Sequence, residues 1–266
     1  MVFTTAIPKI AFTADEVSFL SQNTSPVVID YFDRHPEMIS WVHMSCNESA
    51  GRLLEKYPQN VCWSLASKNP GAIRLLKKYP ELLCWENVSV NPAATDLLRD
   101  NKDKIDWTRI GYNTGAIRLI EENIEKIDDP FALCDNPGAL HLIRNYLDPA
   151  QSFDALDSAC WMYLSGNVGA VHLFPSHADR LYWPWVSSNP AAIEFITENI
   201  ECVDWSFLSQ NRQAAEILAE NLQCVNWQSL SANDGALSII EAFPEKVDRR
   251  LLCTNKNAVH LLFNFK

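Results

Sequence analysis

The sequence predicts an all-α protein, an α-solenoid of about eleven 22-residue helix–turn–helix repeats with one long and one short helix in each repeat. Three observations predict this fold. Tryptophan recurs at intervals of 22 residues, an asparagine follows each of these tryptophans by six residues, and an alanine follows each of those asparagines by three. One such unit cannot bury its own apolar face, so we expect neighbouring units to stack into one continuous core.

The tryptophans form a predicted structural core ladder in two runs: Trp41, Trp63, Trp85, Trp107, Trp161, Trp183, Trp205 and Trp227. Ten asparagines, called the ladder asparagines below, are predicted helix N-caps: Asn47, Asn69, Asn91, Asn113, Asn136, Asn167, Asn189, Asn211, Asn233 and Asn255. An asparagine at an N-cap accepts a backbone N–H of the first helical turn that has no partner within the helix. Asp129 and Arg249 replace tryptophan in two repeats, and Asn23 belongs to a degenerate first copy with two extra residues.

The helices within one unit follow from residues 61–83. Asn69 is the cap, and Pro70 occupies the first helical position, where its missing N–H costs nothing. Apolar residues then recur at helical spacing until Pro80, which ends a predicted long helix of about ten residues. The preceding W-x-x-L-S run predicts a short helix, which Asp106, Asp204 and Asn226 can cap in their own repeats.

Departures from the repeat set the predicted organisation of one continuous solenoid domain. Residues 1–16 are expected to be an N-terminal arm or cap, 17–147 the first half of the array, 148–157 an insertion, and 158–266 the second half. The chain stops at an apolar end without a polar capping helix. This predicts a rod with an open core face that a partner or another copy covers.

Six residues are candidate protein contacts at these departures: Trp185, Asp148, Phe153, Asp157, Phe263 and Phe265. Trp185 is one tryptophan more than the ladder needs, and it is either a contact anchor or an extra core residue. Between residues 186 and 245 the chain carries nine acidic residues and one basic residue, Arg212, whereas the N-terminal half is rich in lysine and arginine. This charge polarity indicates either head-to-tail association and basic partners or an ordinary solvated surface.

Composition excludes several classes of function for the 266 residues. Lysine and arginine number 22 against 33 aspartates and glutamates, a net charge of −11, so we expect no nucleic-acid partner. No apolar stretch approaches the roughly 18 residues of a membrane span, and no signal peptide is recognisable at the start. The eight cysteines include no C-x-x-C pair, which favours reduced thiols that act as small apolar side chains.

Catalytic motifs are missing from the sequence. His141, His172 and His260 share a repeat position that elsewhere holds Arg74 or Glu194, which indicates a solvated surface position rather than a metal site. No H-E-x-x-H, G-x-S-x-G or Walker motif occurs. We therefore expect no catalytic residues, no metal, no cofactor and no enzymatic activity.

The motif W-x-x-L-S-x-N-P-x-A-I-x-L-L, which residues 63–76 and 183–196 approximate, resembles repeat proteins of large nucleocytoplasmic DNA viruses of the mimivirus, phycodnavirus and marseillevirus kinds. The resemblance spans residues 17–265 and departs from the pattern at Asp129, at Arg249 and at the long interval after Asn136. It implies no catalytic residues and a role as a minor structural component of the virion. It also implies assembly in host cytoplasm, where thiols stay reduced.

Two hypotheses for function follow. The first is a non-enzymatic scaffold of a large DNA virus, a minor capsid or other virion protein that bridges capsid proteins and is located in the virion and, during assembly, in the host cytoplasm. The second is a soluble repeat adaptor that binds a host protein, in the manner of ankyrin repeats.

Overall fold

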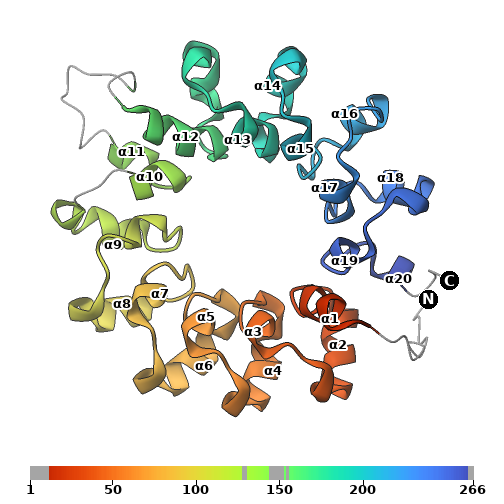
Figure 1. Cartoon of the computed structure of the whole chain (residues 1–266). Helices are drawn as coiled ribbons and strands as arrows, with labels where there is room; N and C mark the ends of the chain where they lie inside the picture. The colour runs from red at the N-terminus through yellow and green to blue at the C-terminus, as the bar shows by residue number, and fades with distance from the viewer. Residues whose placement is uncertain (1–11, 128–130, 144–152, 154–155, 263–266) are drawn as a thin grey trace.

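A computed structural model describes residues 12–127, 131–143, 153 and 156–262 of the chain. Within these residues every regular element is a helix, as the sequence predicts, and no strand occurs. The units do not form a rod with two free ends. They follow one another around a ring, and the first unit lies beside the last (Figure 1).

Two layers of helices make up the ring (Figure 1). The inner layer contains α1 (Ala14–Leu20), α3 (Trp41–Met44), α5 (Trp63–Ser67), α7 (Trp85–Ser89), the 3-10 turn η7 (Ile110–Tyr112), α10 (Phe131–Asp135), α12 (Ser158–Gly166), α13 (Trp183–Ser188), α15 (Trp205–Leu208), α17 (Trp227–Ser231) and α19 (Arg249–Leu252). The outer layer contains α2 (Pro26–Arg34), α4 (Gly51–Lys56), α6 (Ile73–Lys78), α8 (Thr95–Asp100), α9 (Ile117–Glu121), α11 (Leu140–Ile143), the 3-10 helix η10 (Val171–Ser176), α14 (Ile193–Glu198), α16 (Ala215–Glu220), α18 (Leu237–Ala242) and α20 (Val259–Leu262). Each unit contributes one element to each layer.

The predicted long helix is divided in the structure. In the third unit a 3-10 turn, Pro70–Ala72, precedes α6, and a second 3-10 turn, Pro80–Leu82, follows it. The first turn is tight because the N–H of Ala72 bonds to the carbonyl of Asn69, three residues back. The α-helix ends before Pro80 because proline restricts the residue that precedes it. The α-helical part is therefore six residues long, close to the five of α5.

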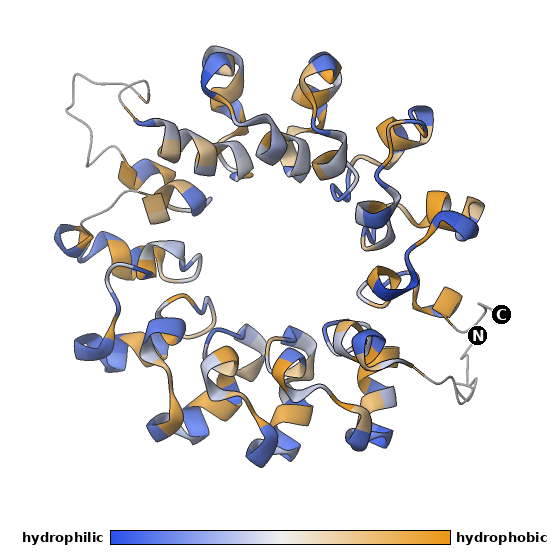
Figure 2. Ribbon diagram, viewed as in Figure 1, coloured by the Kyte–Doolittle hydropathy of each residue, from blue (hydrophilic) through white to orange (hydrophobic). Residues whose placement is uncertain are grey.

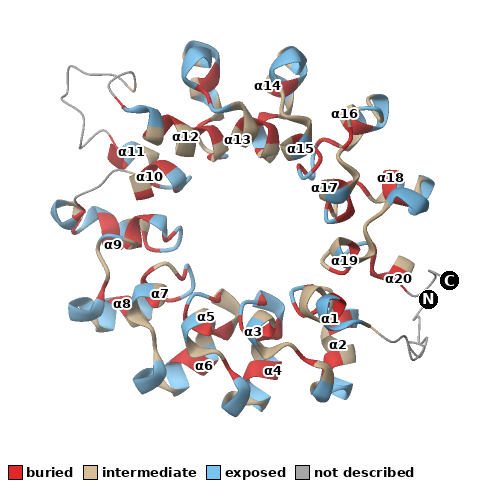
Figure 3. Cartoon of the chain, in the orientation of Figure 1, coloured by how far each residue is buried: buried red, intermediate tan, exposed pale blue. Residues whose placement is uncertain are grey.

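The core lies between the two layers, where buried and apolar residues coincide (Figures 2 and 3). Its centre consists of the repeated alanines and of aliphatic side chains such as Leu76, Leu98 and Ile120, all fully buried. Alanine is required there because a small side chain lets two helices approach closely. Hydrophilic residues are frequent at the outer tips of the ring and also occur along its inner layer (Figure 2).

Seven of the eight ladder tryptophans lie at the edge of this core and not at its centre, which corrects the expectation that they fill it. Only Trp161 is fully buried; the other seven are partly buried and pack against the core. Trp63 meets Tyr79, at the end of its outer helix, with ring centroids 5.4 Å apart, and Lys104 lies 4.7 Å above the ring of Trp85. These seven indole rings therefore cover the edge of the core, where the two layers meet, and remain partly exposed to solvent.

A continuous network of hydrogen bonds joins successive units through the ladder asparagines. The side-chain oxygen of Asn91 accepts the N–H of Ala93, as an N-cap does, at 3.0 Å. Its Nδ2 donates to the carbonyls of Ser67 and Asn69 in the preceding unit, both at 3.0 Å. All ten ladder asparagines are at most 3% exposed, so each side chain serves as a cap and as a buried link to the preceding unit.

A second network uses the serine two residues before the ladder asparagine. Ser67 donates its hydroxyl hydrogen to the carbonyl of Trp63 at 2.7 Å and accepts the N–H of Cys84, in the next unit, at 3.0 Å. The same pair of bonds recurs at Ser45, Ser89, Ser165, Ser187, Ser209 and Ser231. A hydroxyl suits this position because it donates and accepts at once. This serine is the last residue of the W-x-x-L-S run, and the sequence pattern alone predicts no role for it.

The first turn of the third unit requires a residue without a side chain. A Cβ atom on Gly71 would overlap the carbonyl oxygen of Glu48 in the preceding unit. We expect Gly71→Ala to lower the free energy of unfolding by about 1–3 kcal/mol, because the two units must move apart. Urea unfolding followed by circular dichroism measures the loss. In the control, Gly138→Ala, the added Cβ would meet the side-chain tip of Ile117 at 3.1 Å, and equal losses in the two variants would contradict the prediction.

Candidate functional site

The junction between the last and first units, called the seam below, repeats the asparagine network across a large sequence separation. Asn23 Nδ2 donates to the carbonyl of Cys253 at 2.7 Å and to that of Asn255 at 3.2 Å. Nine of the ten ladder asparagines make the corresponding two bonds to the unit before them, and Asn167 makes one of the two. The eleventh unit therefore takes the place of the unit that would precede the first. Helices α1 and α19 are in contact.

An ion pair specific to the seam explains one departure from the repeat. Arg249 occupies the tryptophan position of the last unit, and its Nε lies 2.7 Å from Oε1 of Glu16. The Glu16 side chain is 9% exposed, and its other oxygen accepts the N–H and the hydroxyl of Thr13. Tryptophan would leave this carboxylate without a cation, so arginine replaces it where the ring closes.

These contacts correct the predicted open end. The apolar face of the last unit is covered by the first unit of the same chain, not by a partner or another copy. The predicted boundary at residue 16 falls inside α1, and Glu16 belongs to the seam. Residues 1–11 lie outside the described part of the chain.

The seam shifts the pKa values of two groups. Burial alone would raise the pKa of Glu16, but the hydrogen bonds from Thr13 and Arg249 outweigh burial and place it below its ordinary range. Burial, together with the nearby Glu16 carboxylate, raises the pKa of the Cys253 thiol to about 12. The Cys253 thiol therefore stays protonated at neutral pH and donates to the carbonyl of Arg249 at 3.4 Å, in the position where other units use serine. All eight cysteines are free thiols.

We expect acid to weaken the seam. Because the pKa of Glu16 is lower in the folded than in the unfolded chain, its ionised form stabilises the closed ring above the ordinary carboxyl pKa of about 4.3. That contribution is lost as the pH falls through the folded-state pKa. Thermal melting between neutral pH and about pH 3 should show a steeper loss for the wild type than for Glu16→Gln.

We expect the melting temperature of Glu16→Gln still to fall somewhat as the pH is lowered, because other carboxylates become protonated in the same pH range. At Asp248, for example, burial alone would raise the pKa, but hydrogen bonds from Arg250 and from the N–H of Leu251 lower it. Equal slopes for wild type and Glu16→Gln would contradict a role for Glu16.

A set of aromatic side chains runs along four inner-layer helices, and we call it the inner aromatic row: Phe131 on α10, Tyr163 on α12, Trp185 on α13 and Phe207 on α15. All four side chains are half-buried. The rings of Tyr163 and Trp185 meet edge to face at 5.4 Å, and those of Phe131 and Tyr163 lie 6.3 Å apart. Tyr182, 44% exposed, lies 6.2 Å from Trp185.

Trp185 lies on a different side of α13 from the ladder tryptophan of the same helix, Trp183. Trp183 stacks on Phe195 of the outer helix α14, with ring centroids 5.7 Å apart and planes 11° apart. Trp185 follows two residues later, about 200° around the helix, because each residue turns an α-helix by about 100°. Trp185 therefore lies on the side of α13 opposite to the residue that meets the outer layer, and its ring packs against Tyr163 of the preceding unit.

The candidate contact residues have different locations. Trp185 belongs to the inner aromatic row, Phe153 packs against the core, and Asp157 caps α12 by accepting the N–H of Cys160 at 2.8 Å. Asp148, Phe263 and Phe265 lie outside the described residues, as does Asp129. The repeat pattern does not indicate the rest of the row, because Tyr163 and Phe207 occupy a position that holds His, Leu, Asn, Arg or Ser in other units.

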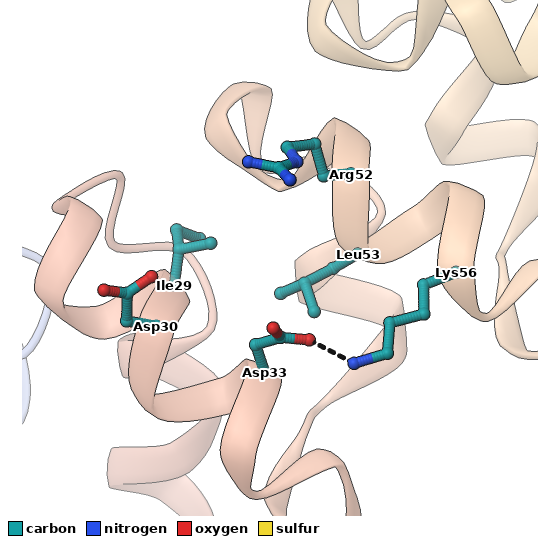
Figure 4. A pocket seen from close by; sticks show the side chains of 6 residues that line it. All are labelled: Ile29, Asp30, Asp33, Arg52, Leu53 and Lys56. Carbon is teal, nitrogen blue, oxygen red and sulfur yellow. Dashed lines mark hydrogen bonds and ion pairs between the residues drawn. The ribbon is translucent and has the colours of Figure 1, made fainter.

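One pocket lies on the outer layer between α2 and α4 (Figure 4). Its volume is about 230 Å³, and its lining includes Ile29, Asp30, Arg52 and Leu53. Asp33 and Lys56 form an ion pair across it, with both side chains about half exposed. A pair this exposed contributes little to stability and marks no reactive group.

The described residues bring together no group of three or more His, Cys, Asp or Glu side chains suited to a metal ion. In that same part of the chain, no helix combines the length and the apolar character that crossing a bilayer requires. Comparison of the chain with family models, with curated proteins and with solved structures returned no match.

Proposed function

We propose that this protein is a non-enzymatic, ring-shaped scaffold, an α-solenoid closed on itself, that binds other proteins. The closed ring is the observation that carries the proposal. The first and last units of the array contact each other in the seam, through Asn23 and the Glu16–Arg249 pair. The molecule therefore presents a frame of fixed shape, and a partner that docks on a preorganised frame loses less free energy to ordering it.

The charge of the outer layer supports contacts with neighbouring proteins. The exposed basic residues of α4 and α6 are Arg52, Lys56, Arg74, Lys77 and Lys78, and the exposed acidic residues of α14 and α16 are Glu194, Glu198, Glu216 and Glu220. These two pairs of helices lie on opposite sides of the ring (Figure 1). Opposite charges on opposite sides of the ring favour one orientation of the protein between neighbouring proteins over other orientations.

We further propose that the scaffold is a minor capsid or other virion component of a large DNA virus, which bridges capsid proteins and resides in the virion and, during assembly, in the host cytoplasm. The repeat motif supports this assignment. Mass spectrometry of purified particles should detect the protein, and cross-linking should join it to capsid proteins. Abundance in infected cytosol together with absence from particles would overturn the virion assignment.

The alternative, a soluble adaptor for a host protein, is distinguished in the same samples. Affinity purification of the full chain from infected cytosol would then give one host protein in a fixed ratio and no capsid protein. An affinity sample without any protein in a fixed ratio would overturn the scaffold proposal itself.

A further inference from the structure

We propose that copies of this protein associate through the outer layer, with α4 and α6 of one ring docked on α14 and α16 of the next. The proposal rests on the scaffold function above and names a second copy of the chain as the neighbouring protein. Two sets of four charged side chains carry it, one on each pair of helices. The basic grid is Arg52, Lys56, Arg74 and Lys78, and the acidic grid is Glu194, Glu198, Glu216 and Glu220.

The two grids occupy the same positions of the repeat. Arg52 and Glu194 each follow a ladder asparagine by five residues, and Lys56 and Glu198 each follow it by nine. Residues four apart lie on one face of a helix. All four helices have six residues and repeat one after the other along the array, so the charges of the two grids share one spacing and differ in sign. The two grids therefore match charge for charge.

The charges of both grids are exposed and largely unpaired within the chain. Among the described residues, the four glutamates form no ion pair, and only Lys56 of the basic grid forms one, with Asp33. Because α4 and α6 also carry Glu55 and Lys77, their net charge is +4, and that of α14 and α16 is −4. The basic residue between α14 and α16, Arg212, lies outside the grid positions.

Acidic residues on both sides of the basic grid favour one register of docking. The neighbouring outer helices α2 and α8 each carry two aspartates and one arginine, and Asp96 of α8 lies 3.8 Å from Lys77. A copy displaced by one unit would place two glutamates against the aspartates of α2 or α8, and like charges repel. The flanking aspartates therefore disfavour the other registers.

The positions of the grids determine how the contact continues. The grids lie on opposite sides of the ring (Figure 1), so a ring that docks through one grid keeps the other free for a further copy. Such a head-to-tail contact builds a row of rings. Exposed ion pairs contribute little individually, so four of them give a weak contact that depends on salt. A weak contact suits a scaffold that assembles where its local concentration is high.

Sedimentation velocity of the full chain tests the proposal without any substitution. At an ionic strength of about 0.05 M, the sedimentation coefficient should rise as the protein concentration increases from roughly 10 µM to 1 mM. The rise should disappear at about 0.5 M, because salt screens exposed charges. A wild type whose sedimentation coefficient does not rise at the lower ionic strength, or rises equally at both, would overturn the proposal.

Reversal of the basic grid should prevent the association. Arg52→Glu/Arg74→Glu is expected to weaken it about tenfold or more, because two attractive pairs become repulsive. The matched control is Arg99→Glu/Arg118→Glu, which changes the net charge equally at exposed positions of α8 and α9 and should associate as the wild type does. Circular dichroism verifies that all variants are folded. Equal association of the two variants would contradict the assignment of the basic grid.

A mixture of two variants gives the sharpest test. Glu194→Arg/Glu216→Arg should also fail to associate with itself, and an equimolar mixture with Arg52→Glu/Arg74→Glu should associate again. Both variants keep a negative net charge, because the wild type carries −11 and each double reversal changes it by about four. Attraction between opposite net charges therefore cannot explain the recovery. A mixture that sediments like its separate components would overturn the pairing of the two grids.

The result also separates this proposal from the scaffold function. If the wild type does not associate with itself while cross-linking still joins it to capsid or host proteins, the scaffold function stands. Only the second copy as the neighbouring protein is then lost.

Discussion

Asn91→Ala is expected to lower the free energy of unfolding by about 3–5 kcal/mol, the largest loss for a single polar side chain in the ring. The substitution removes an N-cap, worth about 1 kcal/mol. It also leaves two buried carbonyls, those of Ser67 and Asn69, without the Nδ2 donor, at about 1–3 kcal/mol each. Asn91 is fully buried, and the site has no access to water that could replace the lost bonds.

Urea unfolding and native-state hydrogen exchange measure this loss in complementary ways. Because a repeat array can unfold in parts, we expect the loss of exchange protection to concentrate in the third to fifth units, around α6, α7 and α9. Asn60→Ala is the control, since Asn60 is an exposed residue of a 3-10 turn. Similar stabilities for the two variants would show that the ladder asparagines are not the link between units.

The double variant Asn23→Ala/Arg249→Ala is expected to open the ring without unfolding its helices. It removes both hydrogen bonds of Asn23 to the last unit and leaves the buried Glu16 carboxylate without its cation. Breaking a buried pair costs about 3–5 kcal/mol, and the loss here is smaller because Arg249 is 29% exposed. The remaining contacts of α1 with α19 must then hold together two ends that no peptide bond joins.

Small-angle X-ray scattering should show a larger radius of gyration for the double variant, and hydrogen exchange should show lost protection in α1 and α19 alone. Circular dichroism should remain unchanged. The matched control is Asn60→Ala/Arg74→Ala, because Asn60 and Arg74 are exposed residues outside the seam. A double variant with the scattering curve of the wild type would refute the role assigned to the seam.

Arg249→Trp tests the reason for the departure from the repeat. It restores the residue that most units carry at this position. If the repeat pattern alone set stability, the variant would be more stable than the wild type. We expect a loss instead, because indole cannot neutralise Glu16. Thermal melting of Arg249→Trp, Arg249→Ala and the wild type measures the difference. A melting temperature of Arg249→Trp above that of the wild type would contradict the role assigned to the Glu16–Arg249 pair.

Part of the candidate site could be predicted from the sequence. Trp185 stood out because the repeat has no place for a second tryptophan, and the loss of tryptophan at Arg249 was visible as a departure. Glu16 carries no such signal, since it precedes the first recognisable unit. Nor does the row, because its neighbours Tyr163 and Phe207 occupy a position that varies from unit to unit. Only adjacency in space turns these residues into one surface.

The sequence by itself determined the helical class, the 22-residue unit, its capping asparagines and its small alanine contacts. These features depend on residues within one unit or in its immediate neighbour, and the same residue types recur in most units. Tertiary structure decided that the tryptophans lie at the core edge, that asparagine and serine also link one unit to the next, and above all that the array closes. Closure of the ring depends on the small rotation of each unit relative to the one before it, summed over eleven units. No local sequence pattern predicts the contact of Glu16 with Arg249, because the two residues are 233 positions apart in the chain.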